Sequence, residues 1–480
     1  MNSFKSAFFL LILFCFGCNS EQKPDKSDLK GFRQLEDIIK SDTLKAITTY
    51  SGTTYFLYKG KAMGFEYDIL KMFADHLGVE LKMIIAKDEN KLIEMLNSGK
   101  GDLIAYGYTI TEDRKQKIDF SEPLYLSHQV LVQKKPKNWR RMKLHNIKKK
   151  IITNPIQLLD DTISVKKNSS YAHRLFNLSN ELGGTIHIDT IPGNTTTDEI
   201  FKKIADGELK YSIVDQNLAS IYSSDYPILD ISTKLSLSQR IAWGLRKNSN
   251  ALKDSLNNWL NENKDNLKYR VVYNKYFKNR RSFRKRVKSE FYSLNDKKIS
   301  PYDDLIKKYA GAIGWDWRLV ASVAYQESQF KPTEESIAGA RGLMQIMPKT
   351  AESLEISDPT DPGQSLRGGT AYLSELWEDH NEIQDSLQRI KFTLASYNAG
   401  PYHVKDAQRL AEHLDLDPNR WDNNVENAIV ELSKPEFYTK DFIKYGYVRG
   451  KQPFLYVRDI FKRYDHYKAF VPIGTAIALK

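Results

Sequence analysis

One glutamate, Glu327, lies at the end of an apolar segment and has the clearest chemical potential in the sequence. The segment Trp317–Ser328 predicts a helix whose apolar side chains cover nearly all of its sides, which implies a buried position. Glu327 lies at the edge of the apolar stripe and near the negative end of the helix dipole. Desolvation and the dipole both favour the protonated carboxyl, which is the form that a general acid needs near neutral pH.

Two blocks of small and neutral polar residues follow this glutamate. The first begins at Ser336 and continues from Gly339 to Pro348 with the sequence Gly-Ala-Arg-Gly-Leu-Met-Gln-Ile-Met-Pro. The second, Ser-Tyr-Asn-Ala-Gly, runs from Ser396 to Gly400. Glycines let a backbone approach a ligand closely, and glutamine, tyrosine and asparagine supply neutral hydrogen bonds. Such groups suit a sugar, which offers many hydroxyls and amides but little charge.

In this order, the Glu-Ser helix end and the two blocks resemble the catalytic domain of family 1 lytic transglycosylases, over about residues 300–480. The resemblance implies an all-α, lysozyme-like domain that cleaves the MurNAc–GlcNAc β-1,4 bond of peptidoglycan. It implies that Glu327 is the only catalytic residue: it protonates the glycosidic oxygen and then accepts the proton of the MurNAc C6 hydroxyl. The product is a 1,6-anhydroMurNAc end, formed without water, and no cofactor or metal ion is implied.

The same resemblance assigns contacts to the sugar. The implied substrate-binding residues are Ser336, Met344, Gln345, Tyr397 and Asn398. Of these, the Tyr-Asn pair would orient Glu327 or the substrate. The sequence departs from the family near its end, where Gln452-Pro453 stand ahead of Tyr456-Val457 in place of the usual Glu-Thr.

Between Leu44 and about Phe277, short apolar strands alternate with amphipathic helices. The pattern predicts strands at 44–49, 79–85 and 101–105 and helices at 65–77 and 90–97. This βαβα order favours a parallel sheet with helices on both faces. A second α/β stretch runs from Thr162 to Asp215, and the chain returns through 241–245. We therefore expect two lobes joined by crossing strands.

Capture of an amino acid between two lobes needs a cation for the carboxylate and an anion for the ammonium. Arg114 and Asp215 are the candidates. The segments 64–68, 101–105, 109–114 and 120–125 resemble family 3 periplasmic solute-binding proteins. The resemblance implies that Arg114 binds an α-carboxylate and Asp215 an ammonium group. The remaining implied ligand-binding residues are Thr109, Ser169 and Ser170.

The first strand ends in Thr48-Thr49-Tyr50 and so has no acidic residue at the family's usual ammonium position. The ligand is therefore either an amino acid or a cell-wall peptide such as a muropeptide. A third alternative is that the domain binds nothing and serves only for spacing.

The N-terminus has the layout of an export signal: Lys5, an apolar run from Ala7 to Phe16, and then Gly17-Cys18. With a cysteine after the small residue, it resembles a bacterial lipoprotein signal, which implies that Cys18 carries the lipid anchor. Asn19 is not the aspartate that commonly retains such proteins at the inner membrane. We therefore expect a protein on the periplasmic side of the envelope, anchored in the outer membrane, with the inner membrane as the alternative.

Composition and charge exclude several other classes. Cys15 and Cys18 are the only cysteines, so no disulfide framework can form, and no apolar run reaches the length of about 18 residues that a polytopic membrane protein needs. The net charge of +12 resides in two basic runs, nine Lys/Arg at 134–150 and seven at 278–288. Neither run carries a nucleic-acid motif, and nucleic acid is excluded as a partner. We expect solvated basic linkers, or contact with an anionic surface.

The sequence thus predicts a multidomain protein with a two-lobed α/β periplasmic-binding-protein fold and an all-α lysozyme-like domain. The expected boundaries are a lipoprotein signal peptide at 1–17, a tether at 18–35, a solute-binding domain at 36–278, a basic linker at 279–299 and a catalytic domain at 300–480. Lobe 1 takes about 36–133 and 241–278, and lobe 2 about 160–235. Two alternatives are a sensory binding protein whose helical domain only holds peptidoglycan, and a lysozyme-type hydrolase.

Overall fold

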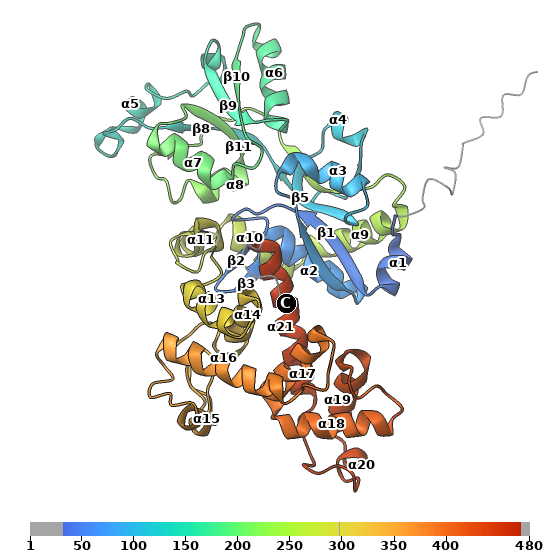
Figure 1. Cartoon of the computed structure of the whole chain (residues 1–480). Coiled ribbons are helices and arrows are strands. Elements are labelled where there is room, and N and C mark those ends of the chain that lie inside the picture. Colours follow the sequence, from blue (N-terminus) through green and yellow to red (C-terminus); the bar gives the residue numbers. More distant parts are fainter. Residues whose placement is uncertain (1–31, 297, 472–480) are drawn as a thin grey trace, which may run out of the picture.

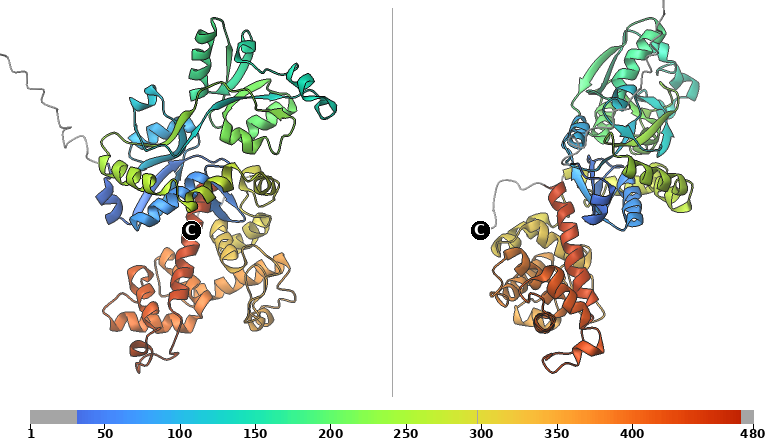
Figure 2. Two further views of the ribbon diagram at one scale, coloured as in Figure 1. Left: turned by 180° about the vertical axis from the view of Figure 1, so that it is seen from behind. Right: turned by 90° about the vertical axis from the view of Figure 1, so that its right-hand side faces the viewer.

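Alternating strands and helices build the first part of the chain into two α/β lobes, and helices alone build the last part (Figure 1). The computed structural model describes residues 32–296 and 298–471. The two lobes and the helical domain lie one above another, and the terminal helix runs up to the middle lobe (Figures 1 and 2). The predicted signal peptide, Cys18 and most of the tether lie outside the described residues.

Lobe 1 is the middle layer of the molecule. Its strands are β1 (Thr43–Thr48), β2 (Phe56–Tyr58), β3 (Lys61–Met63), β4 (Glu80–Ile85), β5 (Leu103–Thr109), β6 (Asp119–Phe120), β7 (Tyr125–Ser127) and β13 (Gln239–Leu245). Its helices are α1 (Leu35–Lys40), α2 (Phe65–Leu77), η1 (Glu89–Lys91), α3 (Leu92–Asn97), α4 (Glu112–Lys115), α9 (Asn250–Asn263) and α10 (Leu267–Phe277). Six strands form one sheet in the order β4-β1-β5-β13-β6, with β7 beside β13.

The sheet of lobe 1 is mixed. β1 runs parallel to β4 and β5, whereas β13 runs antiparallel to β5. The chain re-enters the lobe through β13 after building lobe 2, and this return sets its direction. The parallel arrangement predicted from the βαβα order therefore holds for β4, β1 and β5 only.

Both faces of this sheet are covered because successive strand residues point to opposite sides. Ala46 belongs to the same buried cluster as Phe65 of α2, whereas its neighbour Ile47 packs with Leu92 and Leu96 of α3. The apolar faces of these helices thus explain the near-continuous apolar strands seen in the sequence.

Lobe 2 contains a three-stranded sheet in the order β11-β8-β12 and a pair, β10-β9. Its strands are β8 (Gln129–Lys134), β9 (Thr162–Lys166), β10 (His187–Ile191), β11 (Tyr211–Asp215) and β12 (Leu229–Asp230). Its helices are η2 (Trp139–Arg141), α5 (Leu144–Lys148), η3 (Pro155–Leu158), α6 (Ser170–Leu182), α7 (Thr197–Asp206) and α8 (Gln216–Tyr222). The chain crosses between the lobes twice, from β7 to β8 and from β12 to β13.

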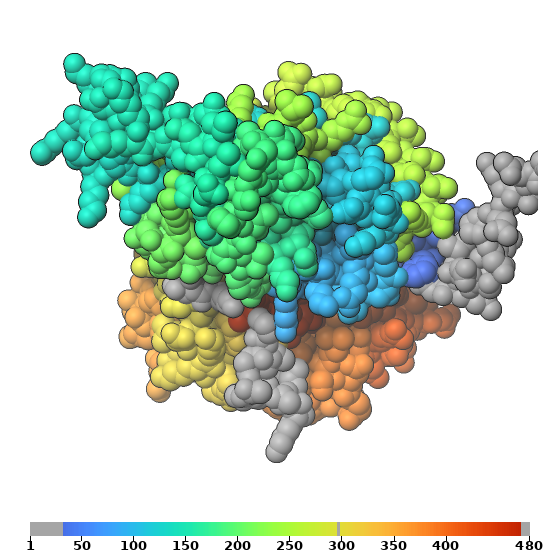
Figure 3. Space-filling model, turned by 90° about the horizontal axis from the view of Figure 1, so that it is seen from above, coloured from blue at the N-terminus to red at the C-terminus, as the bar shows by residue number. Residues whose placement is uncertain are grey.

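The two basic runs of the sequence have different structures. The first, which includes η2 and α5, is mostly exposed and projects from lobe 2 (Figure 3). The second lies in the segment predicted as a solvated linker, and it instead forms α11 (Arg280–Val287), followed by α12 (Ser293–Asp296). Phe283, Arg286 and Val287 have helical spacing and are buried. Because this face packs into the core, the segment is part of the folded body.

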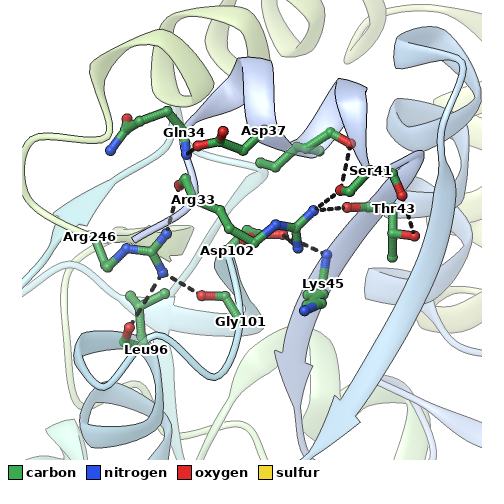
Figure 4. Close-up of polar contacts among 11 residues, drawn as sticks. Arg33, Gln34, Asp37, Ser41, Thr43, Lys45, Leu96, Gly101, Asp102 and Arg246 are labelled. Atoms are coloured by element: carbon green, nitrogen blue, oxygen red, sulfur yellow. Dashed lines mark hydrogen bonds and ion pairs between the residues drawn. The ribbon is translucent and has the colours of Figure 1, made fainter. Parts of the chain in front are cut away.

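The first described residues are fixed to lobe 1 by a polar network (Figure 4). Arg33 forms a salt bridge with Asp102, 2.9 Å long, and the same carboxylate accepts a hydrogen bond of 2.8 Å from the backbone of Lys45. Arg246 donates to the carbonyls of Gly101 and Arg33. The last residues of the segment predicted as a tether, from Phe32 on, therefore belong to the folded body.

The last part of the chain is a helical domain. Its helices are α13 (Asp303–Ala312), α14 (Trp317–Ser328), α15 (Pro348–Ser353), α16 (Pro362–Glu378), α17 (Ser386–Ala399), α18 (Pro401–His413), η4 (Trp421–Val425), α19 (Glu426–Glu431), α20 (Pro435–Tyr438) and α21 (Lys451–Phe470). α21 packs against α14, α17 and α19 and also reaches β4 of lobe 1. Among the helices at 32–296 and 298–471, none is long and apolar enough to cross a membrane.

The β2-β3 hairpin of lobe 1 joins the two domains. Its turn residues, Lys59 and Gly60, have φ values of 51° and 71°, as a two-residue hairpin turn requires. The hydroxyl of Tyr467 on α21 donates a hydrogen bond of 2.9 Å to the carbonyl of Gly60. Next to it, the Tyr55 hydroxyl lies 2.5 Å from Nδ1 of His466. Burial lowers the pKa of His466 to about 4, so its neutral ring can accept that hydrogen bond.

We expect Gly60→Ala to loosen this domain contact. A Cβ at this position would lie 2.5 Å from Tyr325 and from the Tyr467 hydroxyl, and 2.7 Å from Phe330. Gly78→Ala is the matched control, since Gly78 also has a positive φ, +72°, but a Cβ there would have no atom within 4 Å. Overpacking should cost about 1–3 kcal/mol beyond the control, measured by thermal unfolding. Equal losses in the two variants would contradict the tight fit of the hairpin.

Candidate functional site

Local signals fix the helix that carries Glu327. Asp316 caps the start of α14 by accepting a hydrogen bond of 2.9 Å from the backbone of Arg318. The helix ends where Gln329 adopts a left-handed conformation. The hydroxyl of Ser328 donates a hydrogen bond of 2.9 Å to the carbonyl of Leu343, which ties the helix end to the glycine-containing loop. The carboxyl-bearing end of α14 is thus held at a defined position.

Burial keeps a large fraction of Glu327 protonated near neutral pH. It raises the pKa of this carboxyl from 4.5 to about 7, although the hydrogen bond from Tyr456 lowers it. The Tyr456 hydroxyl of α21 donates that hydrogen bond to Oε1 of Glu327. Burial also raises the pKa of Tyr456 well above its usual value, so the phenol stays neutral. The site therefore offers one carboxyl that can both donate and accept a proton.

A cavity of about 760 Å³ opens beside this carboxyl. Its lining residues are Gln326, Glu327, Asn398, Ser433, Tyr447, Arg449, Gly450, Lys451, Gln452, Leu455, Tyr456 and Asp459. Most are polar, as a sugar site requires. Within the described chain, Oδ1 of Asn398 is buried and has no hydrogen-bond partner. Asn398 therefore has an acceptor available for a ligand in this cavity.

The other residues assigned from the sequence are not among the lining residues of the cavity, and they form contacts to or within the loop that follows α14. Tyr397 donates a hydrogen bond of 2.7 Å to the carbonyl of Met344, whose side chain is buried against Gly369. Gln345 donates to loop carbonyls, one of them that of Glu334 at 3.0 Å. Ser336 accepts a hydrogen bond within the same loop. These contacts hold the loop against the end of α14.

Sequence reasoning did not assign Tyr456 to the site, although the Tyr456-Val457 pair was visible in the sequence. Its partner Glu327 lies 129 residues earlier, and no spacing rule links them. Gln452, noted in the sequence as a departure, lines the cavity. In the described residues no group of three or more His, Cys, Asp or Glu side chains is arranged to hold a metal ion.

The ligand-binding residues predicted in the N-terminal domain gather where the two lobes meet. Arg114 donates a hydrogen bond of 3.0 Å to the Thr109 carbonyl, and its guanidinium lies 4.2 Å from the centre of the Tyr108 ring. Across the junction, the Ser170 hydroxyl lies 3.5 Å from that of Thr109. The positive charge of Arg114 also lowers the pKa of Asp215. The junction thus places a cation and an acid from different lobes near each other.

Several buried polar atoms at this junction have no hydrogen-bond partner within the described chain. They include Oδ1 of Asp215, Oγ of Ser169 and the side-chain amide of Gln129. Burial raises the pKa of Asp215 to about 7, against the hydrogen bond from Tyr171 and the charge of Arg114, which lower it. Because buried polar groups are normally paired, this arrangement favours a polar ligand.

Glu66 is a further acid at this junction that sequence reasoning did not assign. It is buried, and its Oε2 has no partner among the described residues. Burial raises its pKa to about 8. Both Glu66 and Asp215 act electrostatically on Tyr125, so the two acids lie on the same side of the domain. The acid that the first strand lacks is therefore available from the start of α2.

Comparisons with known proteins divide the chain in the same way. Residues 44–279 match the model of bacterial extracellular solute-binding proteins, family 3, and residues 304–418 match the transglycosylase SLT domain. These matches confirm the predicted fold class. An ancestral arginine-binding protein bound to arginine, a solved structure, has 25% sequence identity and a TM-score of 0.42. The match covers 49% of this chain and 98% of the chain of that solved structure.

Relatives match nearly the whole chain. A protein of Desulfosudis oleivorans named membrane-bound lytic murein transglycosylase F is 32% identical over 436 residues, which cover 91% of this chain and 92% of that protein. A protein of the same name from Aliivibrio fischeri is 30% identical over 460 residues, which cover 95% and 87% of the two chains. The order of the two domains is thus shared with these relatives.

Glu327 should make the protein less stable as the pH rises. Its pKa is higher in the folded state, about 7, than the ordinary 4.5, so the folded protein binds the proton more tightly between these values. Stability is therefore lost as the pH rises through this window, by roughly 3 kcal/mol at most. Glu327→Gln cannot lose a proton, and we expect its melting temperature relative to the parent to be higher at pH 8 than at pH 5. An offset that does not change with pH would contradict the raised pKa.

Proposed function

Because this chain belongs to the membrane-bound lytic murein transglycosylase F family, it is a lytic transglycosylase acting on peptidoglycan, and we propose that Glu327 is its single catalytic residue. One observation carries this assignment. Glu327 is the carboxyl that lines the large cavity with a pKa raised to about 7 and a tyrosine hydroxyl bound to it. A group of that pKa can act as acid and then as base at neutral pH.

The proposed reaction uses this one carboxyl twice. Protonated Glu327 donates its proton to the oxygen between MurNAc C1 and GlcNAc C4, and the C1–O bond breaks. The carboxylate then accepts the proton of the MurNAc C6 hydroxyl, while that oxygen bonds to C1. The products are a 1,6-anhydroMurNAc end and a GlcNAc with a free 4-hydroxyl, and the carboxyl is again protonated. No water is consumed, unlike the hydrolysis carried out by paired carboxylates.

Tyr456 positions the carboxyl in this scheme. Its hydrogen bond to Oε1 leaves Oε2 of Glu327 for the substrate. Asn398 supplies an acceptor to the sugar, and Tyr397 acts through the Met344 carbonyl on the loop that also contains Gln345. Ser336 holds the same loop and completes the proposed substrate-binding set.

We propose that the N-terminal domain binds an amino acid or a muropeptide at the junction of its lobes. Arg114, Thr109, Ser169 and Ser170 would bind the carboxylate, and Asp215 the ammonium group. The cation–acid pair and the buried atoms without partners support this proposal. Since the β2-β3 hairpin contacts α21, whose Tyr456 holds the catalytic carboxyl, a ligand that shifts lobe 1 would change access to Glu327.

The protein is membrane-bound, as the relatives' names state. We propose that Cys18, which lies outside the described residues, carries a lipid anchor. The apolar run before it and its place after Gly17 support this. The proposed location is the periplasmic face of the outer membrane.

The reaction products test the function and the role of Glu327 together. We expect the protein without its first 18 residues to release anhydro-muropeptides from purified peptidoglycan, detected by mass spectrometry. Glu327→Gln should lower the rate by at least about a hundredfold, because it removes the group that the proposed reaction uses as both acid and base. Glu352→Gln, an exposed glutamate on α15, is the control and should keep the parent rate. Reducing ends would indicate a hydrolase, and no product from the parent would favour the binding-protein alternative.

The proposed ligand site is tested by calorimetry with a soluble muropeptide that carries a tetrapeptide. We expect Arg114→Gln to weaken binding at least about tenfold, since it removes one partner of a charge-assisted contact. Lys115→Gln on the same helix is the control, because Lys115 is exposed and pairs with Glu112. The cleavage rate should also change when the parent is saturated with this ligand. An unchanged rate would refute the regulatory role.

A further inference from the structure

A second cavity, of about 510 Å³, lies between lobe 1 and the helical domain. On the side of lobe 1 it is lined by the β2-β3 hairpin, α2 and Val272 of α10, and on the other side by Tyr325 of α14 and the upper part of α21. Its charged lining residues are Lys61, Asp68, Lys71, Asp459, Lys462 and Arg463. Both domains therefore contribute cations to this cavity.

The second cavity continues the one that contains Glu327. Asp459 lines both cavities. On α14, Tyr325 lines the second cavity and its neighbours Gln326 and Glu327 line the first. On α21, the lining residues follow one another at helical spacing, so they share a face of the helix. The two cavities thus follow one another along one face of α21, from the catalytic carboxyl to the domain boundary, with Asp459 between them.

Arg463 lines the second cavity and is bonded to Gln326, which lines the first. It donates hydrogen bonds of 3.2 Å to the Ser322 carbonyl and of 3.0 Å to Gln326, and its guanidinium lies 4.2 Å from the centre of the Tyr325 ring. These partners are all neutral. In the part of the chain that the structure describes, no carboxylate lies within salt-bridge distance of Arg463. Because a partly buried guanidinium binds carboxylates well, this position favours an anion in the second cavity.

The second cavity has four lining cations and two lining carboxylates, and one of these carboxylates, Asp459, is paired with Arg458 at 3.2 Å. Asp68 is bound by Lys275 at 2.7 Å, while Lys462 is bound to Glu80 at 2.9 Å. Lys71 pairs with Asp75. Lys61 is exposed at the cavity and forms no ion pair within the described residues. A ligand that enters the cavity would therefore meet Arg463 and Lys61 as cations without a carboxylate partner.

We propose that this second cavity binds the carboxylates of the stem peptide attached to the MurNAc that is being cleaved. The proposal rests on the lytic transglycosylase function, since peptidoglycan carries short peptides with free carboxylates on its MurNAc residues. Seven residues separate Tyr456 from Arg463, the cation of the second cavity on α21, which is about 11 Å along the helix. A four-residue peptide reaches about 13–14 Å when extended, so it can span this distance. Contacts at the domain boundary then select strands that still carry peptides.

The test compares two substrates: glycan strands with their peptides, and the same strands after amidase removal of the peptides. Lys61→Gln removes the lining lysine that has no ion-pair partner in the described residues, and Lys59→Gln is the matched control in the same hairpin, because Lys59 does not line the cavity. We expect the parent to prefer peptide-bearing strands. Lys61→Gln should lower kcat/KM about three- to tenfold on those strands and leave peptide-free strands within about twofold. The control should not change the preference.

Three results would overturn the inference: a parent without the preference, equal effects of Lys61→Gln on both substrates, or no effect of Lys61→Gln on either. Equal effects would indicate that Lys61 acts only on domain packing. The proposed function fails separately, if the parent forms no anhydro product from either substrate. Competition by inorganic phosphate that equals competition by the free tetrapeptide would indicate a general anion site and also contradict peptide selection.

Discussion

The contact between α14 and α21 is the constraint on which the catalytic domain depends. It buries the carboxyl of Glu327 far enough to raise its pKa to about 7 and brings the Tyr456 hydroxyl onto one of its oxygens. If Glu327 were buried without Tyr456, no hydrogen bond from that tyrosine would fix the position of the carboxyl. If Tyr456 were bound to an exposed carboxyl, that carboxyl would be ionised at neutral pH. Helix packing thus sets both the pKa and the position of the one carboxyl that the proposed reaction uses as acid and then as base.

The length of α21 extends this constraint to the other domain. The same helix that carries Tyr456 presents His466 and Tyr467 to lobe 1, where they bind Tyr55 and the hairpin turn. A rigid helix shared in this way makes the position of lobe 1 and the geometry of Glu327 mutually dependent. It also creates the boundary at which both domains line one cavity. The fusion of a binding domain to a catalytic domain therefore creates a cavity that both domains line and a helix, α21, that contacts both.

The two halves of the chain use buried acids in related ways. Glu327 has its raised pKa beside an open cavity, whereas Glu66 and Asp215 have theirs at the junction of two lobes. In each case burial disfavours the charged form, and a partner that enters the site can recover the free energy of ionisation. At the lobe junction that partner would be the ammonium group of the proposed ligand, and in the catalytic domain it would be the sugar, which in the proposed reaction exchanges a proton with the carboxyl.

The sequence by itself determined the elements whose signals are local. The helix predicted at 65–77 has the bounds of α2, and α14 coincides with the segment Trp317–Ser328, because helical periodicity and capping residues act within a few positions. The sequence also indicated Glu327 as the candidate acid and gave the order of the two domains. The family matches confirm the predicted fold class and activity. Only the tertiary structure decided that Tyr456 contacts Glu327 and that Glu66 lies at the lobe junction. It also decided that β13 runs antiparallel to β5 and that the basic run at 278–288 packs into the folded body. Hydrogen bonds and burial between distant segments depend on how whole elements pack, and no local pattern encodes that packing.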